Sequence, residues 1–123
     1  MEPGETIIEG VAREVFEETT AEVEVGPLAL IYEFPPHKQS GDYDVNAKHG
    51  LHLIFECTLK NRSIPKLPEN PDLNQTAVKW IPIIELDSIL LLPNITQQIK
   101  NYIANKRNID LIEDYRLEKL YLK

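Results

Sequence analysis

The chain has 123 residues, a length that suits one domain with a single modest core. Its formal net charge of −7 argues against nucleic-acid binding, because proteins that contact phosphate backbones need a basic surface. No apolar run approaches the roughly 20 residues of a membrane-spanning helix, and the first residues lack the basic and apolar regions of a signal peptide. The single cysteine excludes an internal disulfide. We therefore expect a cytoplasmic protein that binds neither nucleic acid nor membranes.

Residues 5–19 are predicted to form an amphipathic helix. Thr6 is the expected N-cap, and Glu9, three residues later, completes the pattern of a capping box. Apolar side chains recur at helical spacing on the side of the helix that would face the core. They include Ile8, Val11, Ala12 and Val15.

The opposite side of this helix carries a cluster of carboxylates. Glu14, Glu17 and Glu18 lie at positions i, i+3 and i+4, within an arc of about 100°. Because like charges at this spacing repel one another, we expect a cation to offset them. Oxygen ligands suit magnesium or manganese, and Arg13 is spaced to pair with Glu17 or with Glu9. A glutamate-rich helix face is most often a solvated surface, so the spacing alone leaves both interpretations open.

After this helix, the chain mixes β-type and helical segments. The β-type segments alternate with period two or are rich in β-branched and aromatic residues; they are residues 23–34, 51–60 and 78–83. A long polar loop separates the first two segments. The helical segments are a turn at residues 84–89 and a helix at residues 95–105, capped by Asn94. Trp80 and Cys57 are expected in the core, and the residues after Arg107 receive no assignment. The mixture predicts the α/β or α+β class.

The segment EPGETIIEGVAREVFEETTA resembles the signature of the Nudix hydrolase family, G-x5-E-x7-R-E-U-x-E-E-x-G-U, in which U is an aliphatic residue. Glu5 matches the first glutamate, and the seven residues 6–12 separate it from Arg13. The motif then continues in register over residues 13–18, and the resemblance runs to Ala21. Gly4 follows a proline at the place where this family often has that pair.

The resemblance implies a fold, a reaction and a cofactor. The fold would be one Nudix-like domain over residues 1–123, with a mixed β-sheet sandwiched between helices. The reaction would be hydrolysis of a diphosphate linkage in a nucleoside diphosphate derivative, by attack of metal-activated water. The enzyme would be a pyrophosphohydrolase dependent on Mg²⁺ or Mn²⁺, and its partner a nucleotide-type small molecule.

The resemblance also implies roles for individual residues. Glu17 and Glu18 would be the principal metal ligands, and Glu14 a further ligand or the base that activates water. Arg13 would orient these glutamates. Glu5, with Gly4 beside it, would support the loop that precedes the helix.

The chain departs from the family pattern in two places. Thr20 stands where the family has the glycine that ends the helix, so we expect strain of roughly 1 kcal/mol there or a different helix end. The glycine that opens the signature and the strands before it have no counterpart, so we expect an N-terminally truncated domain. Unpaired strands would favour a homodimer or a strand-swapped dimer. The alternative function is a catalytically weak or inactive domain that binds a nucleotide or a partner protein.

Residues that would bind the substrate are harder to predict. Aromatic residues in and beside the first strand, Tyr32, Phe34 and Tyr43, are candidates for stacking on a base, although such side chains are more often part of the core. His52 and Glu56 lie on the second strand, where they would flank the substrate cleft or face the metal. The candidates for substrate binding are therefore four residues of the two strands: Tyr32, Phe34, His52 and Glu56.

Overall fold

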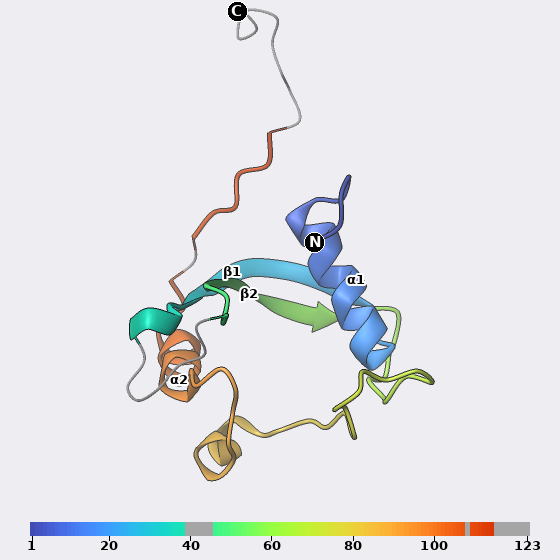
Figure 1. The fold of residues 1–123 in the computed structure, drawn as a ribbon. Coiled ribbons are helices and arrows are strands. Elements are labelled where there is room, and N and C mark those ends of the chain that lie inside the picture. Colours follow the sequence, from blue (N-terminus) through green and yellow to red (C-terminus); the bar gives the residue numbers. More distant parts are fainter. Residues whose placement is uncertain (39–45, 108, 115–123) are drawn as a thin grey trace, which may run out of the picture.

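The computed structural model describes residues 1–38, 46–107 and 109–114. Its elements in chain order are α1 (Ile7–Thr19), β1 (Val23–Phe34), the 3-10 helix η1 (Pro36–Lys38), β2 (Gly50–Leu59), the 3-10 helix η2 (Ile83–Ser88) and α2 (Thr96–Ala104). Both helices and strands are present, and the α+β class is confirmed (Figure 1). No helix in the described part of the chain has the length and apolarity needed to span a bilayer.

Both ends of α1 are set by local hydrogen bonds. At the start, the backbone N–H of Glu9 donates to the Thr6 hydroxyl (3.1 Å), and the Thr6 N–H donates to the Glu9 carboxylate (2.8 Å). This is the predicted capping box. At the end, Thr20 adopts a left-handed conformation with φ 60° and its N–H donates to the Phe16 carbonyl. A β-branched residue in this conformation costs roughly 1 kcal/mol, so the expected strain is present.

β1 and β2 form an antiparallel pair that runs from Val23 opposite Leu59 to Phe34 opposite Gly50. The register shifts between Val25 and Leu30, a stretch that contains Pro27, which has no backbone N–H to donate to a ladder. The two predicted strands are thus confirmed, with β2 displaced by one residue. In the described part of the chain the sheet has only these two strands, without the parallel pairing that a mixed sheet requires.

The two longer helices meet different parts of the sheet (Figure 1). α1 lies against the face of β2 that carries Leu53 and Cys57, since Val11 and Val15 of α1 line pockets together with these residues. α2 packs near Leu30 of β1.

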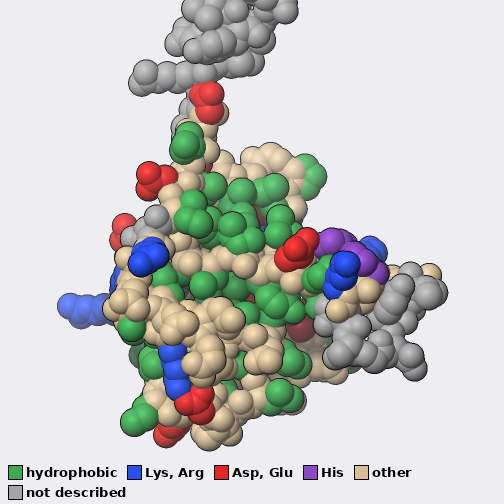
Figure 2. All heavy atoms as spheres, turned by 90° about the vertical axis from the view of Figure 1, so that its left-hand side faces the viewer, with side chains coloured by type: hydrophobic (Ala, Val, Ile, Leu, Met, Phe, Trp, Pro, Cys, Tyr) green, Lys and Arg blue, Asp and Glu red, His purple; other side chains and the backbone are tan. Residues whose placement is uncertain are grey.

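The core is small. Among the described residues, the buried hydrophobic side chains are Ala21, Val23, Leu28 and Leu86. Large apolar side chains remain exposed instead, and Figure 2 shows several groups of hydrophobic side chains at the surface on one side of the molecule. Cys57 was expected to be buried and is half-buried.

Three predictions in the C-terminal half need correction or refinement. Trp80 was expected in the core, but it is 75% exposed. Residues 78–82 form no strand and have no regular secondary structure, because no neighbouring strand in the described chain supplies a ladder. The helical turn near residue 84 is confirmed as η2, whereas α2 begins at Thr96 with Ile95 rather than Asn94 at the N-cap, and Ile95 makes no side-chain cap bond.

Candidate active site

Arg13 is the centre of the polar network on α1. Its Nε donates to Glu5 Oε2 (3.1 Å) and its Nη2 donates to Glu5 Oε1 (2.8 Å), which is a two-pronged contact with one carboxylate. Its Nη1 donates to both oxygens of Glu17, at 3.1 Å each. Of the two partners that the spacing allowed, Arg13 therefore pairs with Glu17, while Glu9 serves the capping box.

This network fixes the charge of its members. Hydrogen bonds from Arg13, and secondarily from the backbone of Glu2, lower the pKa of Glu5 to about 2. The same contacts with Glu5 and Glu17 raise the pKa of Arg13. Both groups are therefore ionised at neutral pH, and the ion pair ties the segment before α1 to the middle of the helix.

The turn before the helix places the Glu5 carboxylate beside Arg13. The Glu5 N–H donates to the Glu2 carbonyl at 3.2 Å, and the Glu2 N–H donates to the Glu5 carboxylate at 2.6 Å. Gly4 closes this turn with φ 82°, a conformation that residues with a Cβ rarely adopt. The predicted supporting residues thus lie together.

Gly10 is a participant that the sequence did not reveal. It is buried inside α1, and a Cβ placed there would lie 3.0 Å from Glu5 Oε1. Glycine within a helix costs roughly 0.5–1 kcal/mol of stability relative to alanine. The glycine here is explained by the Glu5 carboxylate, which occupies the space that a side chain at position 10 would need. Position 10 is one of the unspecified residues of the signature, so the motif gave no signal.

The three glutamates of the predicted metal site are placed on α1 but are not gathered around a point. The side chains of Glu14 and Glu17 are 55% and 56% exposed, and Glu18 is exposed as well. Within the described ranges, no three His, Cys, Asp or Glu side chains lie close enough together to hold a metal ion. The donors nevertheless fit a hard cation in kind, since they are carboxylates in reach of solvent within about one helical turn.

A pocket of about 370 Å³ lies beside Glu14. Its wall combines the N-terminal half of α1 with the start of β2 and is formed by Met1, Ile7, Gly10, Val11, Glu14, Leu51, His52 and Leu53. Glu14 therefore borders a cavity. This placement is what a group that acts on a bound molecule requires.

The candidate substrate-binding residues mostly lie away from the carboxylates. Tyr32 and His52 are paired across the strands with their rings edge to face at 5.5 Å. Phe34 is close to the same histidine, because both approach Gly50. Side chains of a strand alternate between its faces, so these rings lie on the face opposite Leu53 and α1, although His52 borders the pocket beside Glu14. Tyr43 lies outside the described residues.

Glu56 is engaged elsewhere. Lys106, just after α2, donates to its carboxylate at 2.6 Å, and this hydrogen bond raises the pKa of Lys106. Glu56 is thus paired on the side of the sheet where α2 packs, and the structure does not bring it to the carboxylates of α1.

The end of α1 is tied to the later part of the chain by two bonds that sequence patterns do not indicate. The Gln75 side chain donates to the Glu18 carbonyl at 2.7 Å. The Lys66 N–H donates to the Thr19 carbonyl at 2.8 Å. These bonds satisfy carbonyls that a helix end leaves without intrahelical partners, and they hold residues 66–75 beside the carboxylate cluster.

Comparison with known families bears directly on this site. The family model of the NUDIX domain matches residues 1–105, which include α1 with the Arg13 network, both strands and α2. Comparison with curated proteins gives no match, and neither does comparison with solved structures. Nudix domains are in general hydrolases that use divalent metals and act on nucleotide derivatives. With most of its length matched and the network of the signature assembled on α1, the chain belongs to the Nudix family.

Proposed function

We propose that this chain is a Nudix-type pyrophosphohydrolase that cleaves a diphosphate linkage in a nucleoside diphosphate derivative. The observation that carries the proposal is the Arg13 network, in which one guanidinium holds Glu5 and Glu17 together. A structural ion pair on a helix surface needs one carboxylate, and exposed pairs contribute little stability. Two carboxylates on one arginine, with Glu14 next to it at the mouth of a pocket, suit a site that binds charge.

The cofactor that we propose is Mg²⁺ or Mn²⁺, held by Glu14, Glu17 and Glu18. When bound, such an ion supplies positive charge to phosphate oxygens and lowers the pKa of its water. Because a ligand that binds only the folded state stabilises it, magnesium should raise the melting temperature of the wild type. The same addition to Glu17→Gln should have a smaller effect, and equal shifts in both proteins would contradict these ligands.

Arg13, Glu14 and Glu5 have separate roles in the proposed reaction. Arg13 donates to both oxygens of the Glu17 carboxylate, so the orientation of Glu17 on the helix is set before any ligand binds. Glu14 borders the pocket and is exposed, which suits it to take a proton from an attacking water. Glu5 stays ionised and keeps Arg13 in place. A nucleotide-type substrate also fits our expectation of a cytoplasmic enzyme.

The test is hydrolysis of a panel of ADP-ribose, nucleoside triphosphates, diadenosine polyphosphates and nucleotide sugars, with magnesium or manganese. We expect turnover by the wild type and a loss of at least about 100-fold in Glu17→Gln, since a residue at the reacting charge contributes on this scale. The matched control is Glu24→Gln, an exposed glutamate on β1 outside α1. Loss of turnover in the control, or full turnover in Glu17→Gln, would overturn the assignment.

One observation favours a second candidate function. The three glutamates do not converge in the described chain, as expected of a Nudix-like domain that binds a nucleotide or a partner protein without cleaving it. Calorimetric titration with ADP-ribose and magnesium separates the two functions. Binding with no product after prolonged incubation would favour the second candidate, and product formation would exclude it.

A further inference from the structure

Gln75 lies far along the chain from the helix that carries the carboxylates, yet it contacts one residue of that cluster. Its side-chain amide donates to the Glu18 carbonyl oxygen at 2.7 Å, across 57 positions of the sequence. Gln75 is half-buried, whereas residues 71–74 and 76–77 on either side are exposed. Its backbone N–H donates to the Asp72 carbonyl at 2.9 Å. Within this exposed segment, Gln75 is therefore a residue with a defined contact to α1.

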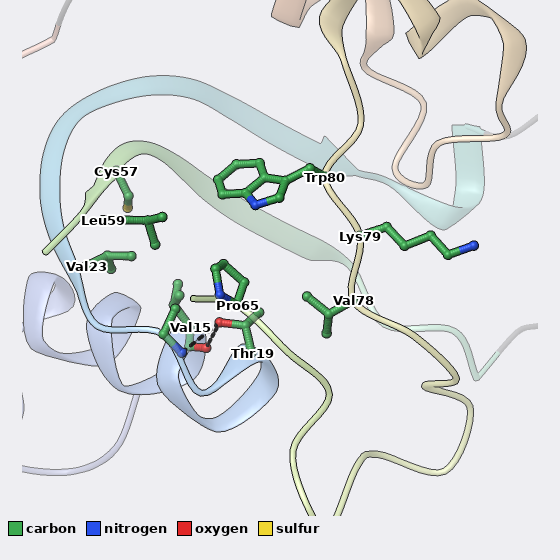
Figure 3. Close-up of a pocket in the computed structure, with 10 residues that line it drawn as sticks. Val15, Thr19, Val23, Cys57, Leu59, Pro65, Val78, Lys79 and Trp80 are labelled. Carbon is green, nitrogen blue, oxygen red and sulfur yellow. Dashed lines mark hydrogen bonds between the residues drawn. The ribbon is translucent and has the colours of Figure 1, made fainter. Parts of the chain in front are cut away.

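The last turn of α1 depends on donors of this kind, because the last four carbonyls of a helix have no intrahelical partner. The Phe16 carbonyl accepts from the Thr20 N–H at 2.8 Å, but Thr20 is in the left-handed conformation, which is strained for a β-branched residue. The Thr19 hydroxyl donates to the Val15 carbonyl at 2.7 Å (Figure 3), a contact that slightly destabilises helices. The bond from Gln75 thus supports a turn whose own residues favour fraying.

The three glutamates of the predicted metal site differ in what holds them. Glu17 accepts two hydrogen bonds from Arg13, at 3.1 Å each. The Glu14 carboxylate lies 3.7 Å from the same guanidinium. The Glu18 side chain is exposed, and its carboxylate makes no hydrogen bond or ion pair with any residue that the structure describes. Within the described chain, the bond from Gln75 is therefore what fixes Glu18 beyond the hydrogen bonds of the helix itself.

We propose that Gln75 is a positioning residue for the metal site, which holds the backbone of Glu18 so that this carboxylate stays on the helix face of Glu14 and Glu17. The inference rests on the proposed function, because it assumes that these glutamates bind a divalent cation. A ligand that is already held in place loses less conformational freedom when the ion binds. Fraying of the last turn would move Glu18 out of the arc that it shares with the other two carboxylates.

An amide suits this role because it donates a hydrogen bond without carrying a charge. An ionised carboxylate at position 75 could not donate to the Glu18 carbonyl. A lysine or arginine could donate, but its positive charge beside the cluster would repel the cation that the glutamates bind. Gln75 therefore stabilises the end of α1 without changing the charge of the site.

The first test needs no metal. Gln75→Met keeps the length of the side chain and removes the donor, so the last turn should open more often. The Thr20 N–H, which bonds to the Phe16 carbonyl, should exchange with deuterium at least about threefold faster in this variant. The Gly10 N–H, bonded to the Thr6 carbonyl in the first turn, should exchange at the wild-type rate. Unchanged exchange at Thr20, or equal acceleration at Thr20 and Gly10, overturns the proposal.

The second test is the affinity for Mn²⁺, measured from the electron paramagnetic resonance signal of the free ion during a titration. Gln75→Met should raise the dissociation constant at least about threefold. The matched control Gln97→Met, at an exposed glutamine of α2, should leave it unchanged. Because Gln75 acts through Glu18, Gln75→Met should have no further effect in a Glu18→Gln background. Wild-type affinity in Gln75→Met, an equal loss in the control, or full additivity with Glu18→Gln overturns the proposal.

The Mn²⁺ titration also separates this inference from the proposed function. A wild type that binds no Mn²⁺ overturns the proposed cofactor, and the role of Gln75 with it. A wild type that binds Mn²⁺ while Gln75→Met binds equally well overturns the role of Gln75 alone. If circular dichroism shows that Gln75→Met does not fold, Gln75→Asn replaces it in both tests, since its amide is one methylene too short to keep the 2.7 Å contact.

Discussion

α1 and the segment of residues 64–92 differ in what holds them. α1 has a capping box at its start and an arginine that pairs with carboxylates before and within the helix, and all these partners lie within residues 5–17. The later segment instead exposes many large apolar side chains. They include Ile64, Leu73, Trp80, Ile84 and Leu90. Local partners therefore fix the start and the middle of the helix that carries the site, whereas the described chain leaves these apolar side chains of the later segment exposed.

The largest effect is expected when the helix loses its central cation. Arg13→Met removes the group that holds Glu5 and Glu17, so the pKa of Glu5 should rise from about 2 toward its ordinary value of 4.5. Turnover should fall by about 100-fold, because Glu17 is no longer oriented. A carbon-13 NMR titration of the Glu5 carboxyl measures the first change. A pKa that stays near its low value would show that Arg13 is not its cause.

The same ion pair predicts a dependence of stability on pH. A carboxyl whose pKa is lowered on folding contributes stability that is fully present above its unfolded value and is lost as the pH falls through its folded value. For Glu5 this window runs from 4.5 down to about 2. Melting temperatures of the wild type and Glu5→Gln should therefore converge as the pH falls through this window. A constant difference across it would exclude the Glu5 contribution.

A smaller effect is expected at the start of α1. Thr6→Ala removes the hydroxyl that accepts the Glu9 N–H, and loss of such a cap costs about 1 kcal/mol. Denaturation by urea measures this as a lower midpoint with an unchanged slope. The matched control is Thr76→Ala, an exposed threonine in an unpaired segment. Equal losses in both variants would mean that the cap has no special role.

The smallest effect is expected in the later segment. Ile84 is 87% exposed, so Ile84→Ala should change the free energy of unfolding by no more than about 0.5 kcal/mol. The same measurement on Val23→Ala, a buried position, should give a clearly larger loss. If Ile84→Ala cost as much as Val23→Ala, the contrast between the two regions would be wrong.

The comparison also explains which parts of the fold sequence patterns could predict. The capping box, the helix and the two strands follow from short-range patterns, and each was found within one or two residues of its predicted place. The pattern at Val78–Ile83 has strand character, but a strand forms only beside another strand. Trp80 is exposed for the same reason, because no described element covers it. Spacing alone allowed Arg13 to pair with either Glu9 or Glu17. Because Glu9 is used in the capping box, Arg13 pairs with Glu17.

Gly10 has a consequence for how this helix tolerates change. Any side chain at this position would contact the Glu5 carboxylate. Glu5 cannot move aside, because Arg13 donates hydrogen bonds to both of its oxygens. In a saturation library at position 10, replacements should survive only together with changes at Glu5 or Arg13. The signature leaves position 10 unspecified. The contact between Glu5 and Arg13 nevertheless restricts this position to a residue without a side chain, although glycine itself carries no charge.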